Sequence, residues 1–534
     1  MALLVSGVEW SDSDEVAREA VAAALGLEAG SVLRCDLVKK SLDARRKRKR
    51  WVANYRVEVS VPEEPLAGRH GVRLWNARDD ERTGRVDPTR ARRQTWPSDV
   101  RPVVVGAGPA GLFAALRLAE AGAPVLLVER GAGVEERINT VNRFWRRREG
   151  LNPSTNVVYG EGGAGTFSDG KIYTRRRDGA LGYVFQRLVD FGADASILTD
   201  GWAHLGTDRV RAMLPAFRAR LQELGVEVAY GVAMTGLLTE GGRCVGVELS
   251  DGRVLRRAPV IVAAGHSARD TYEALVAAGA AAEARAIAIG CRIEHPQDLI
   301  DRARYQGERG ELPPASYRLA WHPPTGRKAH TFCMCPGGIV VPATNHPERV
   351  VVNGMSFSAR KAWWANSAVI VEVQPSEYPG TDPLAGLRYQ DRIEKAAYEL
   401  GGRDYTAPAQ MVVDLLADRE SRELPRTSYP HGIAPVDLRE VLPPGIVAGL
   451  KKAVRQFDRK VPGFAGPEAL LIAPETRTTS PLRFLRDERL ESTTLPGLLP
   501  VGEGAGYAGG IASAALDGVR AASCLVERYA PRLT

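Results

Sequence analysis

The sequence predicts an α/β protein with three parts: a Rossmann-like nucleotide-binding domain, an inserted mixed α+β domain and a small N-terminal α/β domain. Three observations predict this arrangement. A glycine-rich segment after Arg101 lies between an apolar strand and an Ala/Leu-rich helix. Residues 268–467 contain Val/Ile-rich strands of a different pattern. The chain has 534 residues, which exceeds the size of one hydrophobic core.

Residues 1–98 are expected to form the small N-terminal α/β domain and a linker. Helical periodicity over residues 14–25 precedes two β-rich stretches, 31–38 and 51–61. Between them, residues 45–50 are all Arg or Lys. Such a run can bind nucleic acid, but it also suits a solvated hairpin loop. We prefer the hairpin loop because the flanking segments resemble strands, so nucleic acid is not the expected partner.

The composition limits location and chemistry. The N-terminal residues carry no basic leader, and no stretch approaches the roughly 20 apolar residues that span a bilayer. We therefore expect a cytoplasmic protein with no membrane partner. Six cysteines without CxxC spacing do not predict a disulfide framework. No His/Cys cluster has the spacing of metal ligands, so no metal is expected.

The nucleotide-binding domain is expected in two pieces, residues 99–267 and 468–534. Its strongest signal is VVVGAGPAGLFAALRLAEAGAPVLLVERG. Gly106 permits the tight turn, Gly108 lets the backbone approach a pyrophosphate, and Gly111 lets helix and strand pack closely. Glu129, at the end of the next strand, can accept hydrogen bonds from a ribose. Strand, turn, helix, strand and acid together predict a dinucleotide site.

Three further segments favour FAD over NAD. The segment NVVYGEGGAGTFSDGK offers close-approach backbone and the hydroxyl groups of Thr166 and Ser168. The segment VIVAAGHSARDT follows, and LLPVGEGAGYAGGIASAALDGVRAA lies near the C-terminus. In the last segment Glu503 can bind a ribityl hydroxyl. The helix that begins at residues 509–511 can direct its N-terminus at the flavin N1 edge, where it would stabilise a reduced flavin.

The expected FAD-binding residues lie in or beside these segments. They are Gly106, Gly108, Pro109, Ala110, Gly111, Glu129, Arg130, Gly163, Ala164, Gly165, Thr166, Ser168, Met234, Ala264, Gly265, Gly502, Glu503, Gly509, Gly510 and Ile511.

The chain resembles a bacterial family of FAD-dependent dehydrogenases of unassigned substrate. This family belongs to the flavoproteins with two dinucleotide-binding domains and a glutathione-reductase-like FAD domain. The motifs KKSLDARRKRK, GEGGAGTFSDGK, FCMCPGG, VVNGMS, ETRTTSP and GEGAGYAGGI carry the resemblance along nearly the whole chain. The resemblance implies bound FAD and an oxidoreductase fold, but no substrate. Outside the segments assigned to FAD, the sequence lacks the second GxGxxG that disulfide reductases use for NADPH, so any nicotinamide binds otherwise or not at all.

His266, Arg477 and Arg360 are the candidate catalytic residues. His266 follows a strand near the expected cofactor and could act as a general acid, although a histidine that only forms a local hydrogen bond is the preferred interpretation. Arg477 and Arg360 could point into a substrate cleft, and ordinary ion pairs explain them equally. Cys333 and Cys335 form a CxC pair whose spacing along a strand does not favour a disulfide, so structural packing is the preferred interpretation.

These observations predict an FAD-dependent oxidoreductase that passes a hydride between flavin N5 and a small organic substrate. NAD(P)H is a candidate electron donor. A flavin-dependent monooxygenase is one alternative. A flavoprotein that modifies or binds nucleic acid through residues 45–50 is another. The sequence predicts neither the substrate, the direction of the reaction nor the oligomeric state.

Overall fold

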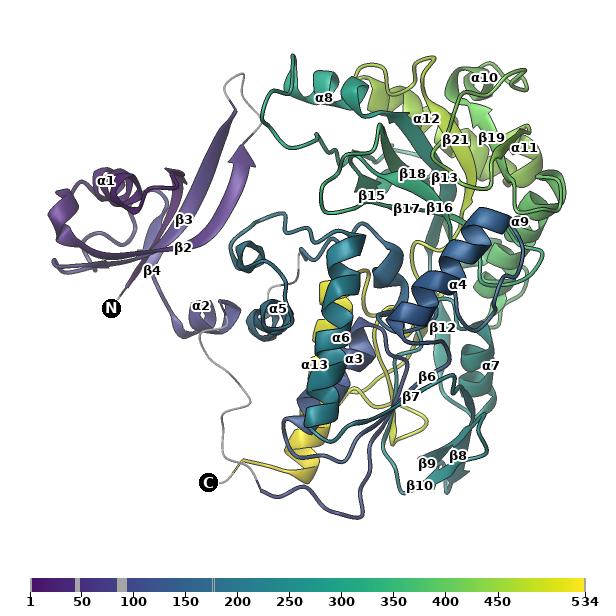
Figure 1. Cartoon of the computed structure of the whole chain (residues 1–534), viewed down its shortest axis with the longest axis horizontal. Helices are drawn as coiled ribbons and strands as arrows, with labels where there is room; N and C mark the ends of the chain where they lie inside the picture. Colours follow the sequence, from purple (N-terminus) through teal and green to yellow (C-terminus); the bar gives the residue numbers. More distant parts are fainter. Residues whose placement is uncertain (1, 44–48, 84–93, 175, 177, 533–534) are drawn as a thin grey trace. The chain divides into compact units, whose positions relative to one another are not determined.

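The computed structural model describes residues 2–43, 49–83, 94–174, 176 and 178–532 (Figure 1). The chain divides into two compact units, each with its own internal packing. The first unit comprises Met1–Arg90 and Lys171–His204, and the second comprises Ala91–Gly170 and Leu205–Thr534. Most of the basic run, residues 45–48, lies outside the described residues.

The first unit is built on a four-stranded antiparallel sheet of order β2–β3–β1–β4. Its strands are β1 (Leu3–Glu9), β2 (Val32–Asp43), β3 (Arg50–Val59) and β4 (Val72–Leu74). Helix α1 (Asp14–Leu25) packs on the sheet through Val21 and Leu25, which share a core with Val57. The helix and the two strands predicted for this region are confirmed, because their periodicity comes from one buried face.

Residues 171–204 belong to the first unit, although the sequence analysis assigned them to the nucleotide-binding domain. The Lys40 N–H donates to the Thr199 carbonyl at 2.6 Å, and the Gly201 N–H donates to the Lys40 carbonyl at 2.8 Å. These bonds add the segment to the edge of β2. Backbone pairing between such distant residues leaves no local pattern in the sequence, which explains the different boundary.

The second unit contains the predicted Rossmann-like domain. Its parallel sheet has the order β23–β11–β5–β6–β7. These strands are β5 (Val103–Val105), β6 (Leu126–Glu129), β7 (Glu227–Tyr230), β11 (Val260–Val262) and β23 (Leu498–Pro500). An antiparallel sheet of β8 (Met234–Glu240), β9 (Arg243–Leu249) and β10 (Val254–Arg256) shares its core. The predicted Rossmann-like domain therefore combines a parallel sheet with an antiparallel one.

A seven-stranded sheet forms the second domain of this unit, in the order β14–β15–β18–β13–β21–β19–β20. The strands are β13 (Ile287–Pro296), β14 (Ala320–Trp321), β15 (Ala329–Cys335), β18 (Trp364–Val373), β19 (Ala407–Met411), β20 (Ile433–Pro435) and β21 (Leu470–Glu475). Strand β21 pairs antiparallel with β13 and β19. The sheet therefore extends past the predicted boundary at residue 467, because the apolar run LLIAPE suits a strand of either domain.

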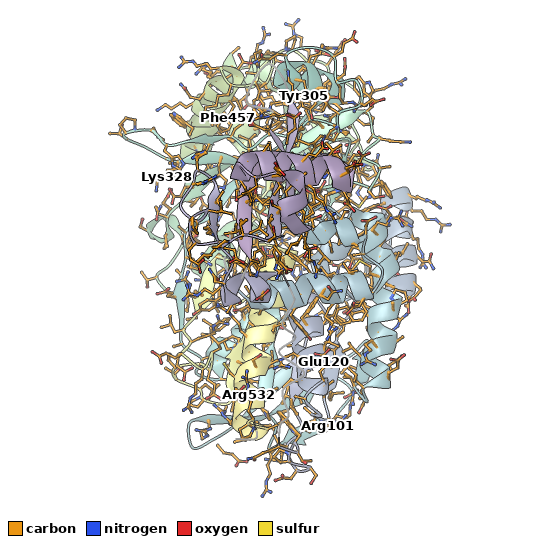
Figure 2. All side chains as sticks on the ribbon, turned by 90° about the vertical axis from the view of Figure 1, so that its left-hand side faces the viewer. Arg101, Glu120, Tyr305, Lys328, Phe457 and Arg532 are labelled. Atoms are coloured by element: carbon orange, nitrogen blue, oxygen red, sulfur yellow. The ribbon has the colours of Figure 1, made fainter. Side chains whose placement is uncertain are left out.

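Helices surround these sheets. They are α2 (Ala77–Arg82), α3 (Pro109–Ala119), α4 (Val134–Arg147), α5 (Ala180–Asp190), α6 (Thr207–Glu223), α7 (Arg269–Ala277), α8 (Gln297–Tyr305), α9 (Ala385–Leu400), α10 (Val412–Leu416), α11 (Leu438–Val441), α12 (Pro444–Asp458) and α13 (Ile511–Tyr529). Two small two-stranded sheets pair β12 (Ala282–Ala284) with β22 (Leu482–Phe484) and β16 (Ile339–Pro342) with β17 (Val352–Met355). Phe457 of α12, labelled in Figure 2, is fully buried, and its ring centroid lies 5.7 Å from that of Phe464.

In the described part of the chain, every helix is too short or too polar to cross a bilayer. Nor do the described residues gather three or more His, Cys, Asp or Glu side chains in a way that could hold a metal ion.

Helices α3 and α13 lie side by side in the nucleotide-binding domain (Figure 1). We expect the position at which they approach each other most closely to tolerate no side chain larger than that of glycine. A Cβ atom on Gly518 would lie 2.0 Å from the Ala110 carbonyl oxygen. Gly518→Ala should therefore force the helices apart and lower the free energy of unfolding by about 2 kcal/mol, a usual cost of overpacking. Thermal unfolding measures this. Gly509→Ala, whose Cβ would meet nothing within 4 Å, is the matched control, and equal midpoints in the two variants would contradict the packing argument.

Candidate functional site

The turn between β5 and α3 contains Gly106, Gly108 and Gly111, and a side chain does not fit at the first or the third. Gly106 has a φ of +102°, and a Cβ there would lie 2.5 Å from the Ala263 carbonyl oxygen. A Cβ on Gly111 would lie 1.8 Å from the Gly106 oxygen. Gly108 is the N-cap of α3, and no side chain caps it. The first N–H groups of α3 are therefore available to an anion.

The second glycine-rich loop lies directly against this turn. Its 3₁₀ helix, Gly163–Phe167, begins where a Cβ on Gly163 would lie 2.9 Å from the Gly108 Cα. The Thr166 hydroxyl donates to the Glu161 carbonyl at 3.0 Å, and the Ser168 hydroxyl donates to the Gly165 carbonyl at 2.9 Å. Both hydroxyl groups are thus engaged inside the loop. What the loop presents toward the α3 turn is backbone.

Glu129 connects the two loops. Its Oε2 accepts from the Ala107 N–H at 2.7 Å, and its Oε1 accepts from the N–H groups of Gly131 and Gly160 at 3.0 and 2.9 Å. The residue is only 6% exposed. A carboxylate has about four acceptor positions, so most of its capacity is used by the protein itself. Glu129 therefore fixes the shape of the site in addition to any contact with a ribose.

Arg130 and Tyr159 continue the site beyond Glu129. Arg130 Nη2 donates to Asp270 Oδ1 at 2.9 Å and to the Thr271 hydroxyl at 3.0 Å. Its guanidinium carbon lies 4.6 Å from the centroid of the Tyr159 ring. The Tyr159 hydroxyl donates to the Ser267 carbonyl at 2.6 Å. These contacts join the end of β6 to the segment after β11.

Partial exposure marks the atoms of this region that can contact a ligand. Four strands of the parallel sheet, all except the edge strand β7, are buried, whereas the turns at their carboxyl ends are partly accessible. The partly accessible residues among those predicted are Gly106, Gly108, Pro109, Arg130, Gly163, Ala164, Gly165, Ser168, Ala264, Gly265, Glu503 and Ile511. Gly509 and Gly510 are exposed. Ala110, Gly111, Glu129, Thr166, Met234 and Gly502 are buried behind this surface.

The C-terminal motif is held by a buried acid of α13. Asp517 Oδ2 accepts from the Gly502 N–H at 2.7 Å, and both Asp517 oxygens pair with Arg486 at 2.9 and 3.0 Å. The neighbouring Glu503 carboxylate has no hydrogen-bond partner among the described residues. Burial raises the pKa of Glu503 to about 8, and the nearby Cys333 adds to the rise. An unpaired carboxyl group beside a fixed turn suits a ligand that carries hydroxyl groups.

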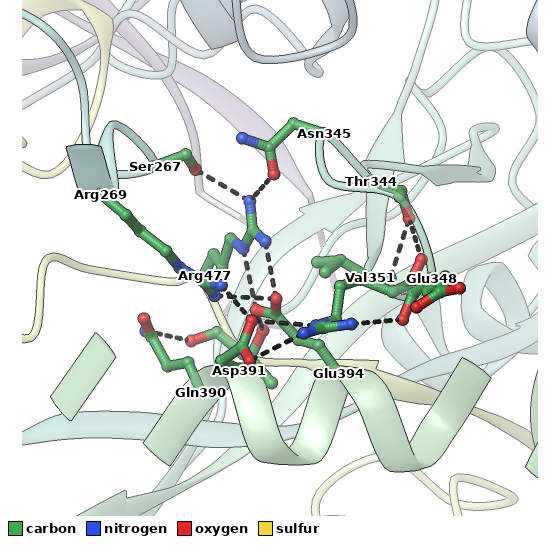
Figure 3. Close-up of polar contacts among 12 residues, drawn as sticks. Ser267, Arg269, Thr344, Asn345, Glu348, Val351, Gln390, Asp391, Glu394 and Arg477 are labelled. Atoms are coloured by element: carbon green, nitrogen blue, oxygen red, sulfur yellow. Dashed lines mark hydrogen bonds and ion pairs between the residues drawn. The ribbon is translucent and has the colours of Figure 1, made fainter. Parts of the chain in front are cut away.

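The structure brings two of the candidate catalytic residues together. Burial, and next to it the charge of Arg477, lower the pKa of His266 to about 4, so its imidazole is neutral at physiological pH. Arg477 forms a double ion pair with Glu394, from Nε to Oε1 at 2.9 Å and from Nη2 to Oε2 at 2.7 Å (Figure 3). Its remaining nitrogen donates to the Ser267 hydroxyl at 3.2 Å and to Asn345. Arg477 is therefore committed to a buried network.

Arg360 lies apart from these two residues. Its Nη2 is 4.0 Å from Asp169 Oδ2, and Asp169 also accepts a hydrogen bond from the Ser356 hydroxyl. Among the described residues, no hydrogen bond or ion pair joins Arg360 to His266 or Arg477. The three candidates thus do not form one catalytic group.

A fully buried ion pair in the seven-stranded sheet was not predicted. Arg292 of β13 pairs with both oxygens of Glu475 at 3.0 and 2.9 Å. Its Nε donates to Asn366, its Nη2 donates to the Cys333 carbonyl, and the same Nη2 lies 3.3 Å from Cys335 Sγ. Charged residues inside the apolar stretches IAIGCRIE and LLIAPE were the available signal. The sequence could not show that Arg292 and Glu475 form an ion pair, because they lie far apart in the chain.

Comparison with known proteins establishes the family. Residues 102–290 match the family described as "FAD dependent oxidoreductase", and residues 286–478 match "FAD-dependent protein, C-terminal domain-like". A protein of Clostridium beijerinckii named "Uncharacterized protein" is 38% identical over 99% of this chain and 99% of its own. The chain belongs to a bacterial family of FAD-dependent oxidoreductases. FAD is therefore its cofactor, and the protein is an enzyme.

Two further matches are weaker. "Protein FixC" of Salmonella typhi is 28% identical over 39% of this chain and 46% of its own length. A solved structure of the E. coli quinol fumarate reductase subunit FrdA is 13% identical over 82% of this chain and 71% of that one, with a TM-score of 0.37. At this TM-score the likeness carries no structural argument.

The residues present fit FAD. The loop at Gly163 approaches Gly108 so closely that a Cβ on Gly163 would not fit, and the α3 turn keeps backbone N–H groups for a pyrophosphate. At the other end of the site, Glu503 lacks a hydrogen-bond partner among the described residues, and the α13 N-terminus begins after two exposed glycines.

Glu129→Gln tests the role of the Glu129 carboxylate. Glutamine keeps one acceptor oxygen but turns an NH₂ group toward a backbone N–H, so at least one buried donor loses its partner. We expect the free energy of unfolding to fall by about 2 kcal/mol, as for a buried unsatisfied group. The affinity of the apoprotein for FAD, measured by quenching of flavin fluorescence, should fall as well. Glu248→Gln, at an exposed position of β9, is the control, and equal behaviour of the two variants would refute the assignment.

Proposed function

We propose that this enzyme transfers a hydride between flavin N5 and a small organic substrate that binds beside the Arg292–Glu475 pair. The observation that carries this proposal is the course of residues 475–480. This segment leaves the Arg292–Glu475 pair and reaches the C-terminal motif, where the Ser480 hydroxyl donates to the Gly504 carbonyl at 3.0 Å. The polar cluster of the second domain and the turn that carries Glu503 are therefore neighbours.

Each part of the chain has a role in this proposal. Bound FAD supplies two-electron chemistry at N5. The glycine turns of β5–α3 and residues 160–165 hold its pyrophosphate, and Glu503 accepts hydrogen bonds from ribityl hydroxyls. Arg292 fixes the backbone at Cys333, whose φ is +43° and whose side chain is half-buried. The second domain then supplies polar groups on the substrate side, and Arg360 of the same domain is a candidate for binding an anionic substrate group.

NAD(P)H is proposed as the electron donor. Outside the segments assigned to FAD no further GxGxxG is present, so the nicotinamide would bind transiently on the accessible side of the flavin. Holoprotein is mixed without oxygen with NADH, NADPH or pooled metabolites, and the visible absorbance of the flavin is followed. We expect one of these to bleach the flavin. If only a chemical reductant such as dithionite does so, hydride transfer is refuted. Oxygen uptake coupled to a hydroxylated product would instead support the monooxygenase.

A second experiment tests the α13 N-terminus. Gly509 is exposed, and a Cβ there meets nothing within 4 Å, so Gly509→Asp adds a charge without a clash. A helix N-terminus near N1 stabilises the anionic reduced flavin, and the carboxylate should oppose it by about 1 kcal/mol. The midpoint potential should fall by roughly 20 mV for a two-electron couple. Gly509→Asn is the neutral control. Equal potentials in the two variants, each saturated with FAD, would show that this helix end does not act on the flavin.

A further inference from the structure

Cys333 and Cys335 of β15 lie at an irregular point of the seven-stranded sheet, where β15 pairs with β18 (Figure 1). Phe332 lies opposite Ala368 and Cys335 lies opposite Asn366, so β15 carries one extra residue between these two pairs. Such a β-bulge bends the strand and redirects its side chains. Cys333 itself has a left-handed backbone, with a φ of +43°. The regular strand spacing, on which the expectation of no disulfide depended, is therefore absent here.

The Cys335 sulfur is directed back toward residue 333. Its thiol donates to the Cys333 carbonyl oxygen at 3.2 Å. The chain turns immediately after Cys335, and a Cβ on Gly338 would lie only 2.9 Å from the Cys335 Cβ, so this cysteine has little room to move away. Both residues are thiols in the structure. Joining them requires the Cys333 side chain to turn toward Cys335, because the Cys335 sulfur already faces residue 333.

Arg292 supplies a buried positive charge to this bulge. Its Nη1 pairs with Glu475, whereas its Nη2 donates to the Cys333 carbonyl and lies 3.3 Å from the Cys335 sulfur. The arginine is 0% exposed. A cation beside a sulfur favours the thiolate, which is the form that attacks a disulfide and the form released when a disulfide breaks. The surroundings of Cys335 therefore suit a cysteine that takes part in thiol–disulfide chemistry.

The two cysteines differ in their access to the cofactor site. Cys335 is 0% exposed, whereas Cys333 is half-buried. Burial raises the pKa of both Glu503 and Glu475, and the nearby Cys333 adds to the rise in each case. Cys333 is thus next to the buried ion pair and also next to the turn that carries Glu503. The accessible thiol lies toward the flavin end of the site, and the buried thiol lies behind it.

We propose that Cys333 and Cys335 form a redox-active pair that exchanges two electrons with the bound FAD. The proposal rests on the cofactor site and the two-electron chemistry proposed above. On oxidation of the pair, both S–H bonds break and one S–S bond forms. The two electrons and one proton pass to oxidised FAD, and the second proton passes to solvent. In the reverse step, two electrons from reduced FAD break the S–S bond, and both sulfurs regain protons.

The first test counts the electrons that the holoprotein accepts. The protein is kept in air, so that flavin and cysteines are oxidised, and is then titrated with dithionite without oxygen. The wild type should take up twice as many electrons per FAD as Cys335→Ser, because flavin and disulfide each accept two. Cys524→Ser, which removes another half-buried cysteine, is the matched control and should behave like the wild type. Equal uptake by the wild type and Cys335→Ser overturns the proposal.

The second test needs no flavin. The flavin-free full-length protein is treated with oxidised glutathione and then with iodoacetamide, and the peptide that contains both cysteines is analysed by mass spectrometry. In the wild type this peptide should lose two hydrogen atoms and carry no alkyl group. In Cys335→Ser it should retain glutathione on Cys333, because no neighbouring thiol remains to displace it. Alkylation of both cysteines in the treated wild type overturns the proposal. Cys333→Ser replaces Cys335→Ser in both comparisons if the latter does not fold, and its peptide should then carry no glutathione because Cys335 is buried.

These tests also separate the cysteine pair from the proposed hydride transfer. If NADH, NADPH and pooled metabolites all fail to bleach the flavin, hydride transfer is refuted, and the dithionite titration still decides whether the pair exists. If one of them bleaches the flavin but the wild type takes up no more electrons than Cys335→Ser, only the cysteine pair is overturned.

Discussion

The carboxylate of Glu129 is the contact on which the cofactor region depends. It accepts backbone N–H groups from the β5–α3 turn, from its own strand end and from the loop at Gly160. Arg137 holds the same loop from the other side, because its guanidinium donates to the carbonyls of Asn156, Val157, Gly160 and Glu161. One buried anion thus binds an N–H group of this loop, and one buried cation binds its carbonyl groups.

The same arrangement, in which a buried acid accepts a backbone N–H and pairs with an arginine, occurs at two further places. Asp517 accepts the Gly502 N–H while Arg486 neutralises it, and Glu161 accepts the Val134 N–H at 2.8 Å while Arg218 pairs with it at 3.0 Å. A glycine-rich turn has no side chains with which to hold its own shape, and each glycine costs conformational entropy on folding. Charged side chains from neighbouring elements supply the missing restraint. Burying them is costly, and the backbone hydrogen bonds and ion pairs offset that cost.

The sequence predicts a feature well when its contacts join residues that lie close together in the chain, and poorly when they join distant residues. The β5–α3–β6 unit was predictable because its strand, turn, helix and acid are adjacent in the chain. The attachment of residues 171–204 to β2, and the meeting of Arg292 with Glu475, depend on residues more than a hundred positions apart. The hydroxyl groups of Thr166 and Ser168 were expected to face a ligand. Their use inside the loop follows from backbone geometry, which residue type does not reveal.

Residue type also suggested that Arg477 and His266 act on a substrate. The contacts and charges around these two residues argue against those roles. Arg477 looked like a substrate ligand, yet its donors are taken up by Glu394, Ser267 and Asn345. His266 looked like an acid, yet burial and the Arg477 charge keep it neutral. A polar group can bind a ligand only through donor or acceptor positions that other protein groups do not already occupy. Beside the glycine turns, such capacity remains at the partly accessible Glu503 and at the open ends of α3 and α13. These are groups that a search for reactive side chains ranks low, and they are the ones best suited to hold a dinucleotide.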